Sequence, residues 1–282
     1  MGYSLENPLD YSGDDGKLLV ALFAAEVDHD ADISDEPTDS VRRDAVAQIR
    51  KAVEPPCSVG PATAYLAVTY LDRFLTKRVT QVDEEQYTLR LASFMFPRTD
   101  PSLALFLFQV KQPWFAVFLS LACLSLASKM LDHGFSVAEF QATQPFQFMP
   151  QTIERLQYLV LESLGWRMRS ITPFAFLDYF LSSFPSTDPR QVQDLKDRAS
   201  KILFHVQTEE MLLGFKPSVI AASALHFAAF DLFPAQFPDF KSAVSSSFGF
   251  DPEKIRVCQE IMRKVNTNRC DLAAAKKVGS GS

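Results

Sequence analysis

Two stretches decide the fold of this chain: ATAYLAVTYLDRFLTKR at residues 62–78 and WFAVFLSLACLSLASKM at residues 114–130. The second stretch carries no charge until Lys129, one residue before its end. It is too short to cross a bilayer, which needs about 20 apolar residues. Because it is apolar on all sides, it predicts a helix surrounded by other helices of a globular domain.

The first stretch has the periodicity of a helix with one buried face. Its apolar residues recur at helical spacing and form one stripe that leaves Arg73 and Lys77 outside. The members of the stripe are Ala64, Ala67, Val68, Leu71, Phe74 and Leu75. The sequence therefore predicts two long helices in the first half of the chain.

The rest of the chain continues this helical pattern. Phe is abundant (25) and Gly is scarce (10), which favours packed helices, and no segment alternates as strands do. Proline, glycine and serine separate the predicted helices. These lie at 40–51, 62–78, 114–130, 136–141 and 150–164, then at 172–183, 190–208, 216–231, 238–246 and 251–265. The predicted fold class is all-α, with two consecutive five-helix units.

This pattern also sets the expected domain organisation. Residues 1–39 are acidic and end in the charge-rich run HDADISDEPTDS, so they predict a flexible N-terminal segment. The first helical unit is expected over 40–168 and the second over 169–266. Residues 267–282 are expected to form a frayed tail.

Composition and motifs argue against several classes of function. A net charge of −6 speaks against nucleic-acid binding, which relies on clustered Lys and Arg. No phosphate-binding glycine loop, serine-hydrolase motif or zinc-protease motif occurs, so we expect neither enzymatic activity nor a cofactor. His205 and Glu209 stand four apart, but two ligands do not make a metal site. The start of the chain has no secretory pattern, so we expect an intracellular protein without membrane association.

The two helical stretches resemble a known family. YLAVTYLDRFL (65–75) followed by ACLSLASKM (122–130) resembles the cyclin box of plant D-type cyclins, and ITPFAFLDYFL (171–181) matches the start of their second unit. The resemblance covers about residues 40–264. The Leu-x-Cys-x-Glu motif is missing near the N-terminus, as in a small subgroup of these cyclins.

The resemblance implies a regulatory subunit that binds and activates a cyclin-dependent kinase at the G1/S step of the cell cycle. It implies a nuclear protein that is also present in the cytoplasm, with kinase inhibitor proteins as further candidate partners. Two alternatives stay open: an adaptor that binds the kinase without activating it, and a transcription factor with the same fold.

The resemblance also assigns site residues. Lys129 matches a lysine that binds backbone carbonyls of the kinase, whereas the alternative is a solvated helix end. Gln157 stands where the family has a glutamate, and Glu154, one turn earlier, is a candidate substitute. Trp166 matches an aromatic residue at the kinase interface, with a core tryptophan as the alternative. Arg42 and Asp72 match a structural ion pair.

An insertion separates the two stretches. Residues 82–109 lengthen the connection beyond that of the family, and their removal restores DRFL-TKRVTQ-VKQPW. The segment begins with Val and ends with Gln, whose codons are compatible with GT and AG at its two ends. We therefore hypothesise a retained intron or a misassigned gene model; the alternative is a genuine loop.

Overall fold

The computed structural model describes Leu22, Phe23, Glu26 and residues 36–79, 113–131, 134–186, 188–248 and 250–279. The chain divides into two compact units. We name residues 31–170 the box unit, and residues 1–30 together with 171–282 the C-terminal unit. Every regular element among the described residues is helical, with five α-helices in each unit, so the predicted fold class is confirmed.

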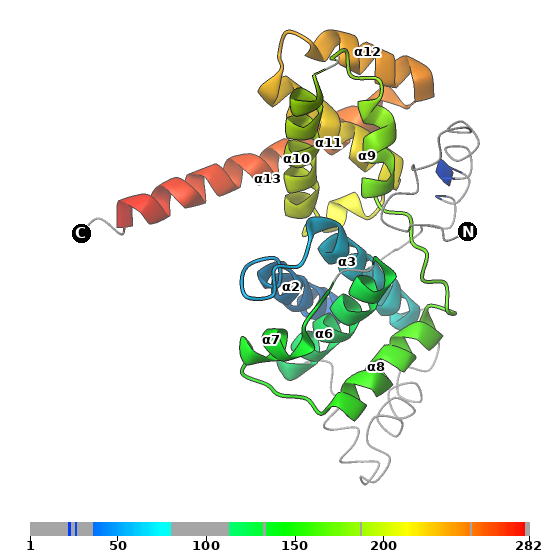
Figure 1. Cartoon of the computed structure of the whole chain (residues 1–282), viewed down its shortest axis with the longest axis vertical. Coiled ribbons are helices and arrows are strands. Elements are labelled where there is room, and N and C mark those ends of the chain that lie inside the picture. The colour runs from blue at the N-terminus through cyan, green and yellow to red at the C-terminus, as the bar shows by residue number, and fades with distance from the viewer. Residues whose placement is uncertain are drawn as a thin grey trace. The chain divides into compact units, whose positions relative to one another are not determined.

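The box unit is built around one buried helix. Its α-helices are α2 (Glu36–Lys51), α3 (Pro61–Val79), α6 (Pro113–Met130), α7 (Val137–Ala142) and α8 (Pro150–Ser163). Every side chain from Phe115 to Ser128 of α6 is buried, and α2, α3, α7 and α8 pack around it (Figure 1). The prediction of a helix surrounded by other helices is confirmed.

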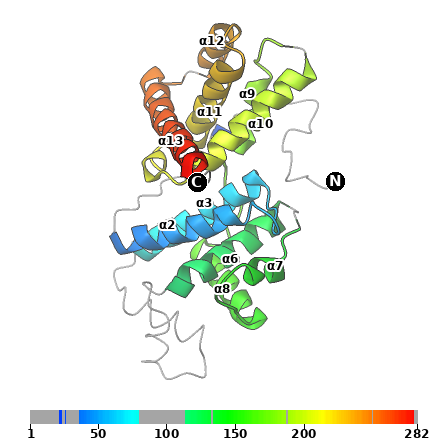
Figure 2. The same cartoon turned by 90° about the vertical axis from the view of Figure 1, so that its left-hand side faces the viewer.

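The C-terminal unit repeats this plan around α11. Its elements are α9 (Phe174–Leu181), α10 (Pro189–Val206), the short 3-10 helix η2 (Glu210–Leu212), α11 (Pro217–Leu232), α12 (Phe237–Phe248) and α13 (Pro252–Gly279). Helices α9, α10, α12 and α13 pack on α11, which Figure 2 shows beside α10 and α12. Buried alanines such as Ala221, Ala222 and Ala228 let the neighbouring backbones approach closely.

Proline begins many of these helices. A proline at the first helical position costs no hydrogen bond, because the first amide groups have no partner inside the helix. Pro150 begins α8 in this way, as predicted. Helix α2 differs from its prediction, since it begins at Glu36 rather than at Ser40. Pro37 favours an early first turn and leaves Ser40 inside the helix.

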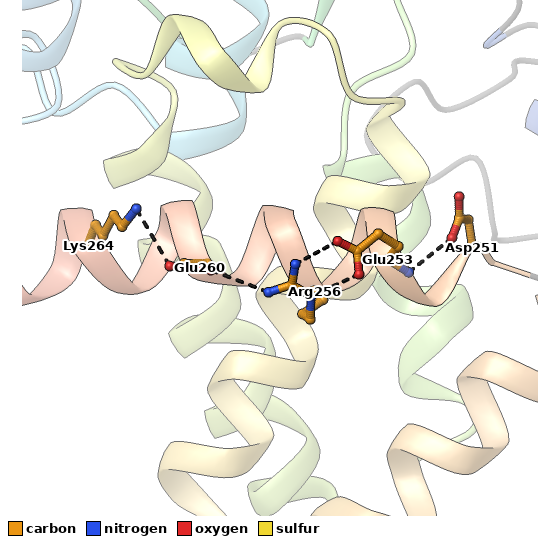
Figure 3. Close-up of polar contacts among 5 residues, drawn as sticks. All are labelled: Asp251, Glu253, Arg256, Glu260 and Lys264. Carbon is orange, nitrogen blue, oxygen red and sulfur yellow. Dashed lines mark hydrogen bonds and ion pairs between the residues drawn. The ribbon is translucent and has the colours of Figure 1, made fainter.

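Helix α13 runs to Gly279, although a frayed tail was expected from residue 267. Its last residues are mainly Ala, Leu and Lys, which favour helix, and no Gly or Pro interrupts them before Gly279. Figure 3 shows a series of charged contacts along its first half. The series begins where the Asp251 carboxylate accepts a hydrogen bond from the backbone N–H of Glu253. Arg256 pairs with Glu253 at 2.6 Å and with Glu260 at 3.5 Å, and Lys264 follows Glu260 at 3.6 Å. Such pairs stabilise a helix on its exposed face.

The N-terminal segment also differs from its prediction. Leu22 and Phe23 pack against the core of the C-terminal unit, and Glu26 is buried within the same unit. Leu22 and Phe23 are large apolar residues, which a flexible acidic segment would leave exposed. The insertion at residues 82–109 lies outside the described residues. Among the helices described, none has the length and apolar character needed to cross a membrane.

Candidate kinase-binding site

Lys129 ends the buried helix α6 with an exposed charge. The helix body before it is packed on all sides, so its direction is fixed by the core of the box unit. The ammonium of Lys129 donates to the Oε1 atom of Gln157 on α8 at 3.0 Å. This contact holds the lysine at the end of α6 against the middle of α8.

Gln157 is buried and uses both ends of its amide. Its Nε2 group donates to the hydroxyl of Ser125 at 3.0 Å, while its Oε1 atom accepts from Lys129. Ser125 lies four residues before Lys129, on the same face of α6. An amide carries both a donor and an acceptor, so one side chain satisfies both neighbours. We name Ser125, Gln157 and Lys129 the amide bridge.

The amide bridge adds a residue that the sequence analysis missed. Ser125 was not selected, although its spacing of four from Lys129 is a signal that helical periodicity provides. Gln157 points inward to the bridge and is 8% exposed. Glu154 lies exposed one turn earlier on α8. The ammonium is thus held by Gln157, and the structure does not bring Glu154 into the bridge.

Three large apolar side chains are exposed along α8 and at its two ends. Met149 is the residue before the helix, Tyr158 lies within it, and Trp166 follows its end. They are 73%, 57% and 63% exposed, and they are the exposed large apolar residues of the box unit among those described. Such residues are candidates for contacts with a partner protein. Trp166 is therefore a surface residue, which excludes the alternative of a core tryptophan.

Trp166 is held by the way α8 ends. Its amide donates to the carbonyl of Leu161, and the amide of Gly165 donates to that of Glu162, which is the Schellman pattern of a helix end. Gly165 and Trp166 both have positive φ, of 59° and 60°. This conformation suits glycine and is uncommon for tryptophan.

Helix α3 fixes the segment after Trp166. The Tyr70 hydroxyl donates to the carbonyl of Met168 at 2.6 Å, and Arg73 donates to the carbonyl of Arg167 at 2.8 Å. Arg73 also donates to the hydroxyl of Ser170 at 2.7 Å. Burial raises the pKa of Tyr70 well above its ordinary value, so it donates as a neutral phenol. Arg73 was expected outside the packed face of its helix, but it is half-buried and donates to the Arg167 carbonyl and the Ser170 hydroxyl.

Arg42 and Asp72 are brought together between α2 and α3. The Nε and Nη2 groups of Arg42 donate to the two carboxylate oxygens of Asp72 at 2.8 and 3.2 Å. Arg42 is 1% exposed. Burial raises the pKa of Asp72, and the Arg42 guanidinium opposes that rise. The pair ties two helices of the box unit and lies away from solvent.

His205 and Glu209 do not share a helix, because α10 ends at Val206. Among the residues described, no group of three His, Cys, Asp or Glu side chains is placed to hold a metal ion.

Comparison with known proteins gives the family. The model of the C-terminal domain of cyclins matches residues 171–280. Cyclin-D6-1 of Oryza sativa subsp. japonica is 33% identical over 264 residues, which cover 92% of this chain and 73% of the rice protein. Putative cyclin-D6-1 of Arabidopsis thaliana is 35% identical over 207 residues, which cover 72% of this chain and 59% of that protein.

Solved structures share the fold at low identity. A chain of the CAK complex of Chaetomium thermophilum bound to ATP-gamma-S matches with a TM-score of 0.51 at 17% identity, over 93% of this chain and 77% of that one. A chain of the yeast TFIIK (Kin28/Ccl1/Tfb3) complex matches with a TM-score of 0.50 at 16% identity, over 89% of this chain and 95% of that one. Because it is 33% identical to the rice protein over 92% of its own length and 73% of that protein, the chain belongs to the plant D-type cyclins.

Proposed function

We propose that this cyclin is the regulatory subunit of a cyclin-dependent kinase, which it binds through the box unit and activates. The observation that carries the proposal is the amide bridge, in which Gln157 holds the exposed Lys129 ammonium on the box unit. Its membership of the D-type cyclins supports the same role. The cyclin itself acts by binding and has no catalytic activity in this proposal.

The fixed ammonium suits a helix of the kinase as its target. Lys129 has three N–H donors, and Gln157 takes one of them. The remaining donors suit backbone carbonyls, which are left without partners at the C-terminal end of a helix, where the helix dipole attracts a cation. A lysine held in place before binding loses less conformational entropy than a mobile one.

The apolar residues around α8 supply the remaining contacts. Met149, Tyr158 and Trp166 offer large side chains to a partner, and aromatic and methionine side chains are enriched in protein interfaces. Trp and Tyr are also among the residues that most often carry the binding energy of an interface. Packing on the regulatory helix of the kinase would bring its catalytic Lys–Glu pair into register.

Reconstitution with a purified plant cyclin-dependent kinase tests this function. We expect a stable complex whose histone phosphorylation requires the cyclin. Met149→Ala should weaken the complex, whereas Met211→Ala, a control at a methionine of similar exposure in the C-terminal unit, should leave it unchanged. A kinase that neither binds nor gains activity would contradict the proposal.

The same assay distinguishes an activating cyclin from an adaptor that binds the kinase without activating it. It is favoured by Gln157, because a neutral acceptor forms weaker hydrogen bonds than the glutamate of the family. Stable binding without phosphorylation would establish an adaptor. The cyclin-fold transcription factor is less well supported, since a net charge of −6 opposes DNA binding.

We place this activity at the G1/S step and in the nucleus, with a cytoplasmic fraction, on the basis of the D-type family. Kinase inhibitor proteins are further proposed partners of the complex. Arrest of cells before DNA synthesis on depletion of the cyclin would support the first assignment. Normal entry into DNA synthesis would contradict it.

A further inference from the structure

A half-buried guanidinium of the box unit has only neutral hydrogen-bond partners. Arg73 of α3 donates to the Arg167 carbonyl at 2.8 Å and to the Ser170 hydroxyl at 2.7 Å. Among the described residues, no carboxylate pairs with it, since Asp72 beside it in the sequence is bound by Arg42. Cations that are held away from water are usually paired with an acidic group. The charge of Arg73 is therefore uncompensated within the described part of the chain.

The guanidinium of Arg73 also keeps hydrogen-bond donors. Both of its bonds use the Nη1 atom, so its Nε and Nη2 groups have no partner among the described residues. These two groups form the edge of the guanidinium fork that binds two oxygens of one carboxylate or phosphate. An anion with several oxygens beside Ser170 would satisfy the charge and the donors together.

Further positive charge lies close to Ser170. Burial lowers the pKa of Arg73, and the charge of Arg167 adds to this effect, so the two guanidinium groups are near enough to repel each other. Arg169 is exposed and directly precedes Ser170 in the chain. The Ser170 hydroxyl thus contacts one arginine and has two more beside it, a setting that favours a negative charge.

Ser170 lies in a segment that a modifying enzyme can bind. Residues 167–172 form no helix or strand, and Ser170 is half-buried rather than enclosed. A phosphoserine carries about −1.5 to −2 charges at pH 7 and three acceptor oxygens, and opposite a group of arginines it forms charge-assisted hydrogen bonds. Phosphorylation would therefore place on Ser170 the anion that Arg73 lacks.

We propose that Ser170 is a phosphorylation site whose phosphate is held by Arg73 and Arg167. The modifying enzyme is a protein kinase that recognises arginines before the target serine, here Arg167 and Arg169. It transfers the γ-phosphoryl group of ATP: the bond from Ser170 Oγ to phosphorus forms, the bond from the γ-phosphorus to the bridging oxygen breaks, and ADP leaves. The hydroxyl proton passes to a base of the modifying kinase. The phosphate then ties residues 167–170 to α3. The site uses no residue of the amide bridge, so it does not depend on the proposed function.

Full-length cyclin made with phosphoserine at position 170, by genetic code expansion, tests the site without the modifying kinase. Scanning calorimetry compares this protein with the unmodified chain. The phosphate should raise the melting temperature by at least about 2 °C. Arg73→Met, which keeps an apolar stem but no charge, should abolish this rise. Because each comparison is made within one background, any stability that Arg73→Met itself loses cancels.

Phosphoserine at position 182 is the matched control. Ser182 is exposed at the C-terminal end of α9, and its hydroxyl donates to the Tyr179 carbonyl at 2.6 Å. The helix dipole disfavours an anion at this end of a helix, so this phosphate should not raise the melting temperature.

Mass spectrometry of the cyclin purified from dividing plant cells should find phosphate on Ser170. An unmodified Ser170 throughout the cell cycle would overturn the proposal, as would an unchanged or lowered melting temperature of the phosphoserine protein. An equal rise in the Arg73→Met background would do the same. If inorganic phosphate added to the unmodified chain gives an equal, Arg73-dependent rise, the site binds a free anion and the proposal is also overturned.

Discussion

Two cations of the box unit lie in opposite surroundings, and their surroundings determine what each can do. Arg42 is fully buried and has both carboxylate oxygens of Asp72 as partners. Lys129 is exposed, and a neutral amide holds it. Arg42 therefore stabilises the fold, whereas Lys129 keeps N–H donors that can bind another protein.

Gln157→Leu should weaken kinase binding without unfolding the box unit. Leucine fills the volume but accepts no hydrogen bond, so Lys129 loses its fixed position. We expect a loss of about 1–2 kcal/mol in calorimetric titration against the kinase. Gln157→Glu should bind at least as well as the wild type, because a carboxylate accepts from both Lys129 and the Ser125 hydroxyl. Equal affinity of the Leu variant would show that the bridge does not position the lysine.

Arg42→Ala should destabilise the box unit by about 3–5 kcal/mol, because it leaves the Asp72 carboxylate buried without its partner. Urea unfolding followed by circular dichroism measures the loss. Arg198→Ala is the control, since Arg198 pairs with Asp231 at 2.6 Å on the surface, where a pair contributes at most about 1 kcal/mol. Similar losses for the two variants would refute the structural role of the buried pair.

Among the helices, α6 and α11 show why the fold could be predicted from the sequence. Each is nearly uncharged and buried along most of its length, a pattern that only a surrounded helix satisfies. The apolar stripe of α3 and the proline at the start of α8 also allowed these two helices to be predicted from the sequence. The contacts of Arg73 could not be predicted from the sequence, because they join residues 94 and 97 positions apart.

Helix α11 also carries a buried titratable group. Both ring nitrogens of His226 lack a hydrogen-bond partner among the described residues, and the ring packs against Phe237 and Phe240 at 6.2 and 5.8 Å. Burial, with the nearby Lys241 charge, lowers the pKa of His226 to about 4 from 6.5. The folded protein therefore keeps this histidine neutral at a pH where the unfolded chain protonates it.

The stability of the C-terminal unit should thus fall as pH drops from about 6.5 toward 4. Between these values the unfolded chain binds the proton and the folded one does not, so protonation favours unfolding. Between pH 7 and 5 the wild type should lose about 2 kcal/mol more than His226→Leu, which cannot titrate. Urea unfolding at both pH values measures this difference, and identical pH profiles for the two proteins would contradict it.

At the scale of the whole molecule, the sequence predicted the two units and their order, but not what the N-terminal segment does. Its acidic run 29–40 suggested flexibility, whereas Phe23 and Glu26 find partners in residues 176–250. Such long-range contacts depend on the finished fold of the C-terminal unit. The amide bridge is similar, because the orientation of Gln157 follows from how α6 packs against α8.

The insertion gives a prediction for the whole chain. Deletion of residues 82–109 leaves five residues, 80–81 and 110–112, between Val79 of α3 and Pro113 of α6. Helix–helix connections of about 2–8 residues are common in compact domains. The deletion variant should be at least as soluble as the wild type and bind the kinase at least as tightly. An unfolded box unit, detected by circular dichroism, would show that the segment is part of the native fold.

Calorimetric titration of Lys129→Ala against the kinase shows whether the fixed ammonium of Lys129 binds the kinase. The variant should keep its helical content and lose about 2–5 kcal/mol of binding free energy, as for a truncated charged contact at an interface. Lys254→Ala, at an exposed lysine of the C-terminal unit, should bind like the wild type. If Lys129→Ala binds the kinase as tightly as the wild type, the ammonium is not a kinase-binding group.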